Sequence, residues 1–187
     1  MIHALKTAAR RARSFCKRED GSSTIELVLL LPVYVTMFLM AFEGGRISLN
    51  HVMLERGLDL TVRDVRLGVQ IGTSPEPTHA ELKARICDYS RIIPDCLNQL
   101  QLEMISMDVR AWSTRLDGPI RCVDRALDVQ PAVQFTNGGN NELMVLQVCS
   151  LFDPVVPSSG LGKHIPKQSG GAYALVASSA FVMEPFQ

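Results

Sequence analysis

The sequence GSSTIELVLLLPVYVTMFLMAF (residues 21–42) decides how this chain of 187 residues is organised. Between Ile25 and Phe42 the only charged residue is Glu26, and the only helix-breaking residue is Pro32. A helix needs about 17–25 mostly apolar residues to cross a bilayer, so the run is just long enough. A secretory signal peptide has a similar layout, but this run is longer than a usual signal core, and no small-x-small cleavage site follows it. The stretch therefore predicts one transmembrane helix that stays attached to the chain.

The charges on the two sides of this run differ, although the whole chain has a formal net charge of zero. Residues 1–20 carry six basic and two acidic side chains, a net charge of +4, so the remainder carries −4. Basic residues beside a membrane span mark its cytoplasmic side. We therefore expect a single-pass protein of a bacterial inner membrane, with a cytoplasmic N-terminus and a periplasmic C-terminal domain. The basic segment is too short for a nucleic-acid-binding domain, so no nucleic-acid partner is expected.

Four of the five cysteines lie on the far side of the run, at Cys87, Cys96, Cys122 and Cys149, whereas Cys16 lies in the basic segment. An even set of four in an oxidising compartment predicts two disulfides. Three connectivities are open. We favour Cys87–Cys96 as a short staple, with Cys122–Cys149 joining two strands. The alternative is that all four are small buried hydrophobic side chains.

The segment after the membrane run has helical periodicity. Apolar residues recur at gaps of seven, four, seven and four residues, at Ile47, Leu54, Leu58, Val65 and Val69. This spacing indicates one face of a helix, so residues 46–72 are predicted as a juxtamembrane amphipathic helix that ends near Gln70. The Gly44–Gly45 pair before it is a candidate hinge. The apolar face can pack on the protein's own domain or dock on a partner, and the pattern favours neither.

Residues 73–187 predict a periplasmic α+β domain, with a small, mostly antiparallel β-sheet and one or two helices. Thr78 and Glu81 form a capping box at the start of a helix that Pro94 stops after Ile93. Four strand-like runs follow, at residues 102–112, 119–127, 142–152 and 173–183.

The most specific signal lies where the basic leader meets the apolar run. Gly21 ends the leader, Ser22 begins a neutral stretch, and Glu26 is the fifth residue after the glycine. This order resembles a type IV prepilin. The resemblance implies that prepilin peptidase cleaves between Gly21 and Ser22, which makes residues 1–21 a cytoplasmic leader and residues 22–45 the transmembrane helix.

Glu26 has two interpretations. An ionised carboxylate costs about 2.5–3.5 kcal/mol at the centre of a membrane helix, and less near its end, so its presence needs a reason. The prepilin resemblance implies that Glu26 pairs with the N-terminal amine of a neighbouring subunit during assembly. From the residues alone, Ser23 and Glu26 are also a capping box, in which the carboxylate satisfies backbone donors at the helix start. Both interpretations can hold together.

Residues 21–46 resemble more closely the start of TadE/TadF-type proteins, the minor pseudopilins of the tight-adherence (Flp) pilus system. The shared features are the Gly-x-x-x-x-Glu junction, a proline in the apolar run, and an acidic or small residue before a basic one just after it. Two later stretches, 150–162 and 172–186, are similar to late segments of some relatives. The resemblance implies a pilus assembly protein that acts by subunit interactions, with the inner membrane, prepilin peptidase and other pilus components as partners, and without enzymatic activity or a cofactor. Leu27 is a departure from the major pilins, which carry an aromatic residue there.

Other chemistry has weaker support. A zinc site on His79, Cys87 and Cys96 is the one metal alternative, and its cysteine spacing of nine lies outside the usual structural zinc pattern. The sequence Gly160-Leu-Gly-Lys163 lacks the first glycine and the Ser or Thr of a phosphate loop. The alternative to a pilus assembly protein is a ligand-binding protein. It would be an envelope protein held by an uncleaved signal anchor, with a periplasmic ligand-binding domain.

Overall fold

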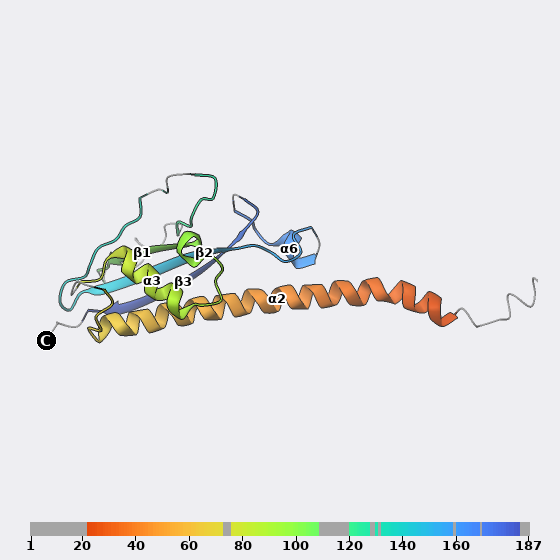
Figure 1. The fold of residues 1–187 in the computed structure, drawn as a ribbon, viewed down its shortest axis with the longest axis horizontal. Coiled ribbons are helices and arrows are strands. Elements are labelled where there is room, and N and C mark those ends of the chain that lie inside the picture. Colours follow the sequence, from red (N-terminus) through yellow and green to blue (C-terminus); the bar gives the residue numbers. More distant parts are fainter. Residues whose placement is uncertain are drawn as a thin grey trace, which may run out of the picture. The chain divides into compact units, whose positions relative to one another are not determined.

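The computed structural model describes residues 22–72, 76–108, 120–127, 130, 132–158, 160–168 and 170–183. Its elements are α2 (Ser22–Arg66), α3 (His79–Tyr89), α4 (Cys96–Gln99), β1 (Leu100–Ser106), β2 (Leu143–Phe152), α6 (Gly160–His164) and β3 (Tyr173–Val182). The chain divides into two compact units, Met1–Ala41 and Phe42–Gln187. We call Phe42–Gln187 the C-terminal unit; Figure 1 shows that it holds the whole sheet. The predicted leader, residues 1–21, lies outside the described residues.

Helix α2 runs without a break from Ser22 to Arg66. Pro32 lies inside it, and the Gly44–Gly45 pair is also helical. The apolar run and the amphipathic segment therefore form one continuous helix, and the candidate hinge at the glycine pair stays a prediction.

The helix ends at Arg66, earlier than the predicted end near Gln70, because Gly68 reverses the chain. Gly68 has a φ of 64°, a conformation that only glycine adopts at little cost. Its N–H donates to the carbonyl of Val65 at 3.2 Å, and the N–H of Val69 donates to the carbonyl of Asp64 at 2.9 Å. These two bonds form a Schellman motif, which satisfies carbonyl groups at the helix end.

One face of α2 packs on the core of the C-terminal unit. Leu54 and Leu58 are at most 1% exposed, Val65 is also buried, and Ile47 is partly buried against the same cluster. The predicted apolar face therefore packs on the protein's own domain. Val69 is the exception, because it lies beyond the end of the helix and remains exposed.

Two buried polar residues complete this face. Asn50 and Thr61 occupy the seven-residue gaps in the apolar pattern, and both are buried. Thr61 Oγ1 donates to the carbonyl of Gly57 at 2.8 Å, and Asn50 Nδ2 donates to the hydroxyl of Tyr173 at 3.4 Å. A search for apolar residues finds only the apolar part of this face. The buried face itself is continuous, because Asn50 and Thr61 fill the gaps.

Helix α3 begins as predicted. The N–H of Glu81 donates to Thr78 Oγ1 at 3.3 Å, and the N–H of Thr78 donates to Glu81 Oε2 at 2.9 Å, so the capping box is confirmed. The helix ends at Tyr89 rather than Ile93, because the chain turns at Ser90 and brings Ile93 into the core.

Helices α2 and α3 approach each other closely at Gly57. A Cβ atom there would overlap Ser90 Oγ, which donates to the carbonyl of Met53 at 3.1 Å. Leu82 and Ile86 on α3 are fully buried in the same core. Glycine at this position therefore permits the contact between the two helices.

The three strands form an antiparallel sheet in the order β1-β2-β3, so β2 lies in the middle. Alternate strand residues such as Leu102, Leu146 and Val148 are fully buried in one cluster with the α2 leucines. The α+β class with a small antiparallel sheet is thus confirmed. Strand β1 starts before the predicted run 102–112, and residues 109–112 lie outside the described part of the chain.

The predicted strand at residues 119–127 is wrong over its described part, 120–127, which is irregular. Val123 from this segment packs with Leu151 and Ala172 against the sheet face opposite the helices. The segment covers the sheet instead of extending it, so its apolar residues contact side chains rather than a neighbouring strand.

Both favoured disulfides are present. Cys87–Cys96 joins α3 to α4, with Cα atoms 5.7 Å apart, and Cys122–Cys149 joins the covering segment to β2, with Cα atoms 5.2 Å apart. The second disulfide does not join two strands, because Cys122 lies in the irregular segment. Cys16 lies outside the described residues.

Removal of Cys122–Cys149 by alanine at both positions should destabilise the protein more than removal of Cys87–Cys96. Their sequence separations are 27 and 9 residues, and the loop-closure model assigns each about 2–4 kcal/mol, with the longer loop about 1 kcal/mol ahead. Urea unfolding of the full chain in detergent without reductant measures both losses. Cys16→Ala is the control, and a larger loss for the shorter loop would refute the ranking.

Candidate functional site

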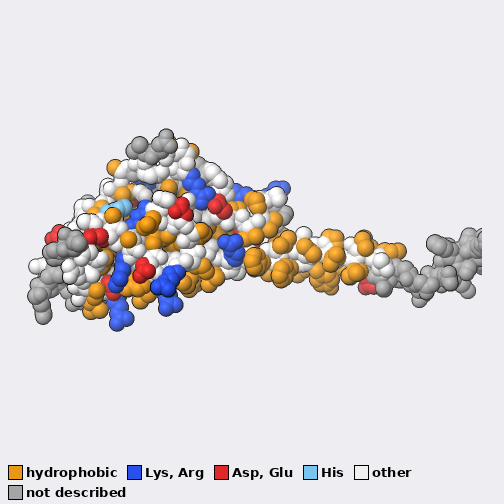
Figure 2. Space-filling view, viewed as in Figure 1, with side chains coloured by type: hydrophobic (Ala, Val, Ile, Leu, Met, Phe, Trp, Pro, Cys, Tyr) orange, Lys and Arg blue, Asp and Glu red, His pale blue; other side chains and the backbone are white. Residues whose placement is uncertain are grey.

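The N-terminal part of α2 exposes an apolar surface. Of its large apolar side chains between Ile25 and Phe42, all except Leu39 are exposed, to between 42% and 69% (Figure 2). An 18-residue window of this helix has a mean hydropathy of 2.2 and none of it is buried. An apolar surface of this size marks an interaction with a membrane or with other proteins. Among the described residues α2 is the one helix long and apolar enough to cross a membrane, and it is a candidate single-pass anchor.

Glu26 lies on this exposed part of α2, and its own side chain is exposed. Gly21, on the other side of the predicted cleavage point, lies outside the described residues. Ser22 is the first helical residue, but its side chain and that of Ser23 also lie outside the described part. The processing junction and the capping box of Ser23 and Glu26 therefore both stay predictions.

The exposed apolar stretch is followed directly by a buried carboxylate. Glu43 is 2% exposed, and its Oε2 accepts the N–H of Val155 at 3.0 Å and the N–H of Val156 at 3.3 Å. Its Oε1 also lies 3.1 Å from the N–H of Val155. Hydrogen bonds to an ionised acceptor are about twice as strong as neutral ones. Glu43 thus fastens the loop after β2 to the start of the buried face of α2.

Sequence reasoning assigned no role to Glu43. The helical spacing of Glu43 indicates its burial. Glu43, Ile47 and Asn50 are four and three residues apart, so they share one helix face. The buried face therefore begins at a charged residue, which a search for apolar residues passes over.

Tyr173, the first residue of β3, is buried close to this contact. Burial raises the pKa of its hydroxyl above the usual value, and the charge of Glu43 acts in the same direction, whereas the hydrogen bond from Asn50 opposes them. Its ring stacks on Phe152, with centroids 5.9 Å apart. The neutral tyrosine therefore ties this part of α2 to the adjoining ends of β2 and β3.

A second polar contact holds α3 to α2. Asp64 Oδ2 accepts hydrogen bonds from Arg85 Nε at 2.9 Å and from the Tyr89 hydroxyl at 2.7 Å, and it forms an ion pair with Arg85 Nη2 at 2.8 Å. The bond to Asp64 is the main cause of a raised pKa at Tyr89, and the Arg85 guanidinium lies 4.8 Å from the centroid of that ring. This arrangement fixes the two helices relative to each other.

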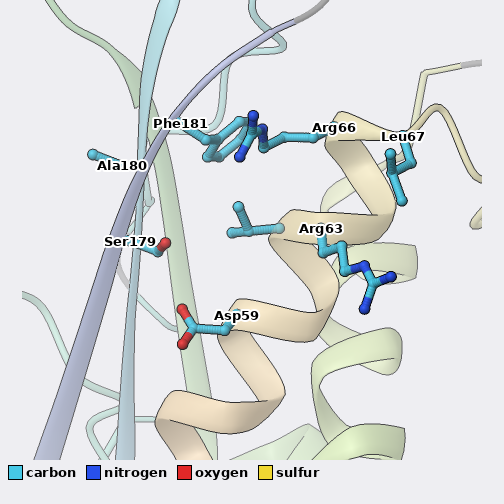
Figure 3. Close-up of a pocket in the computed structure, with 8 residues that line it drawn as sticks. Asp59, Arg63, Arg66, Leu67, Ser179, Ala180 and Phe181 are labelled. Atoms are coloured by element: carbon cyan, nitrogen blue, oxygen red, sulfur yellow. The ribbon is translucent and has the colours of Figure 1, made fainter.

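A groove of about 450 Å³ lies between the end of α2 and β3 (Figure 3). It is lined by Asp59, Val62, Arg63, Arg66, Leu67, Ser179, Ala180 and Phe181. Figure 3 shows Asp59 and Arg66 extending from α2 toward β3, where Phe181 lies. A carboxylate, guanidinium groups and apolar side chains together suit the binding of a ligand or of a partner segment.

The zinc alternative at His79 is wrong. Cys87 and Cys96 are bonded to each other, and His79 Nε2 lies 3.1 Å from the carbonyl of Leu102 with its ring edge-on to Phe135. Within the described ranges, no group of three His, Cys, Asp or Glu side chains is arranged to hold a metal ion.

Comparison with known families gives a match in the N-terminal part of the chain. Residues 21–63 match the model of the family described as TadE-like protein. The match spans the predicted processing junction, the apolar stretch and most of the buried face of α2, and it confirms the resemblance found in the sequence. Comparisons with curated proteins and with solved structures give no match. The matched family is pilus-associated and structural, not enzymatic.

Glu43→Ala should loosen the loop after β2, because the N–H groups of Val155 and Val156 lose their acceptor. A hydrogen bond to a charged group contributes about 1.5–3 kcal/mol, so the free energy of unfolding should fall by about 2–3 kcal/mol. Urea unfolding measures this loss, and hydrogen exchange should accelerate at the two amides.

The matched control is Glu55→Ala on the same helix. The Glu55 side chain is 51% exposed and lies 3.7 Å from His51, so its loss should cost below about 0.5 kcal/mol. Equal losses in the two variants would show that the Glu43 contact has no special role.

Proposed function

We propose that the chain is a Tad pilus-associated protein, and specifically a minor pseudopilin of a tight-adherence (Flp) pilus machine, because residues 21–63 match the TadE-like family. In this proposal prepilin peptidase cleaves between Gly21 and Ser22. The apolar part of α2 then anchors the mature chain in the inner membrane, and the C-terminal unit contacts other pilus components. The protein acts by subunit interactions and catalyses no reaction.

The observation that carries the proposal is the coincidence of the family match with the exposed apolar helix. A helix that buried this surface in its own domain would be a core element, but α2 buries none of its most apolar window. Its next turns are buried in the C-terminal unit. Such a helix has a free part for lipid or for neighbouring subunits, and a fixed part that carries the folded unit.

Glu26 makes it favourable for the subunit to leave the lipid and assemble with its neighbours. Its carboxylate lies near the start of the apolar stretch, where an unpaired charge is costly in the membrane. After cleavage, the new amine at Ser22 would be positively charged near neutral pH. Pairing between Glu26 of one subunit and this amine of a neighbour removes both costs and sets the axial register between subunits.

The proposed topology follows from charge and redox chemistry. The net charge of +4 in residues 1–20 favours a cytoplasmic leader, and the apolar segment of residues 22–45 would then cross the membrane. Disulfides persist in oxidising compartments, so the two bonds support a periplasmic site for residues 46–187.

The alternative is a signal-anchored envelope protein with a ligand-binding periplasmic domain. In that case the groove between α2 and β3 would hold the ligand, and the leader would remain on the chain. The two functions differ in the N-terminus of the mature protein, which is therefore the decisive measurement.

The mature chain isolated from membranes should begin at Ser22. Mass spectrometry of the N-terminal peptide measures this directly, and loss of prepilin peptidase or the substitution Gly21→Val should leave the full leader in place. Gly44→Ala, outside the junction, should still be processed. An intact N-terminus in the unsubstituted protein would favour the signal-anchored alternative.

Glu26→Ala should insert into the membrane but support few pili. Removal of the carboxylate saves up to about 2.5–3.5 kcal/mol of insertion cost, so membrane levels should be unchanged or higher. Pili counted by electron microscopy should fall several-fold because the subunit pairing is lost. Glu55→Ala serves as the control, and normal piliation in Glu26→Ala would exclude the pairing role.

A further inference from the structure

The loop after β2 and helix α6 lie next to the point where α2 leaves the apolar stretch. Glu43 binds the loop through the N–H groups of Val155 and Val156. Leu161 Cδ2, on α6, lies 3.8 Å from the position that a Cβ atom on Gly44 would take. Figure 1 shows α6 at the opposite end of the C-terminal unit from the end of α2. These contacts fix the loop and α6 within one helical turn of Phe42.

The dimensions of a bilayer bring this region to its surface. Residues 25–42 extend about 27 Å at 1.5 Å per residue, close to the hydrocarbon thickness of about 30 Å. The headgroup layer adds about 5–7 Å on each side. If the apolar stretch spans the membrane, Glu43 and Gly44 lie at the boundary of this layer, and the residues that contact them lie in it or against it.

The surface of the loop and of α6 is both apolar and basic. Val155 is 41% exposed and Leu161 is 38% exposed, although both are aliphatic. Lys163 and Lys167 are exposed beside them; Lys167 also donates to the carbonyl of Pro157 at 3.0 Å. Aliphatic side chains beside lysines are the chemistry of a segment that lies on an anionic lipid surface.

The nearby acidic groups do not neutralise the positive charge of Lys163 and Lys167. The Glu43 carboxylate is buried on the loop backbone. Asp153 is paired with Arg125, with Nη1 and Oδ1 2.7 Å apart. The exposed charge on this part of the loop is therefore positive, complementary to lipid phosphates.

We propose that Val155, Leu161, Lys163 and Lys167 form a second membrane contact, which we call the interfacial patch. Val155 and Leu161 enter the headgroup layer, and the two lysines bind phosphates of anionic phospholipids. The inference rests on the proposed membrane anchor, and it adds a role for the C-terminal unit. The patch holds that unit against the bilayer, so that Glu43 stays on the membrane side of the fold, shielded from lipid by the loop it binds.

Depth-dependent quenching of tryptophan fluorescence tests the contact. The full chain carrying Leu161→Trp is reconstituted in vesicles of phosphatidylcholine and phosphatidylglycerol whose acyl chains are brominated near the headgroup. The signal of Trp112 in the unsubstituted chain is subtracted. Leu161→Trp should be quenched several-fold more than Val182→Trp. Val182 is the matched control, since it is 45% exposed and lies at the other end of β3, about 30 Å from Tyr173 at 3.3 Å per residue.

The charged part of the contact is tested by lipid composition. In the Leu161→Trp chain, Lys163→Glu together with Lys167→Glu should reduce the quenching to the level found in pure phosphatidylcholine vesicles. Equal quenching with and without phosphatidylglycerol would overturn the assignment of the two lysines. Val155→Trp is a second reporter in case Leu161→Trp disturbs α6, and both disulfides are checked on a non-reducing gel.

A reporter in the apolar stretch separates this inference from the proposed function. Tyr34→Trp should be quenched by lipids brominated near the end of the acyl chain. If it is quenched while Leu161→Trp and Val155→Trp both behave like Val182→Trp, the interfacial patch is refuted and the anchor stands. If Tyr34→Trp is not quenched either, the anchor and the patch both fall. If Leu161→Trp is shielded from water only when other pilus components are added, the lipid contact is also refuted, since the partner would then be a protein.

Discussion

The buried face of α2 is the constraint on which the C-terminal unit depends. Leu54 and Leu58 are almost completely enclosed by α3 and the sheet, and burial of a leucine side chain contributes about 1.5–3 kcal/mol. Because this face belongs to the same helix as the exposed apolar stretch, the chain passes directly from the candidate anchor into the core of the C-terminal unit. A single helix therefore links a surface for lipid or subunits to a stable domain.

Polar contacts determine how the rest of the chain meets this helix. Glu43 fixes the loop after β2, Asn50 meets Tyr173 on β3, and Asp64 holds Arg85 on α3. Apolar packing alone tolerates sliding of one element along another, whereas these bonds are directional and have defined partners. Along α2, Asn50 lies about two helical turns after Glu43, and Asp64 lies about four turns after Asn50, so each contact sets the position of a different part of the fold.

The small sheet needs additional support on its second face. Only three strands are present among the described residues, and the helices cover one side. The segment 120–127 covers the other side without regular structure, and Cys122–Cys149 attaches it covalently to the central strand. Cys149 and Leu151, which are at most 1% exposed, thus gain a cover that is irregular over its described residues 120–127. A disulfide is an effective way to hold such a segment, because it reduces the entropy of the unfolded chain.

The sequence by itself determined the features that depend on neighbouring residues. The apolar run, the capping box at Thr78, the order of the main strands and the family resemblance could all be read along the chain. The end of α2 is also encoded locally, because Gly68 adopts the positive φ that the Schellman motif requires. Residues 120–127 were predicted as a strand because a local pattern of apolar residues does not specify whether a segment pairs with a strand or covers one.

Only the tertiary structure decided what lies opposite each side chain. The loop that meets Glu43 is more than 100 residues away in the chain, and the same is true of the tyrosine that meets Asn50. No local periodicity encodes such a partner. A charged or amide side chain on a helix is ordinarily solvated, and its burial becomes favourable only when distant backbone or hydroxyl groups supply the hydrogen bonds. The sequence therefore predicted where α2 would be buried through its apolar residues, whereas the fold decided that the buried face also includes Glu43, because the loop after β2 provides its donors.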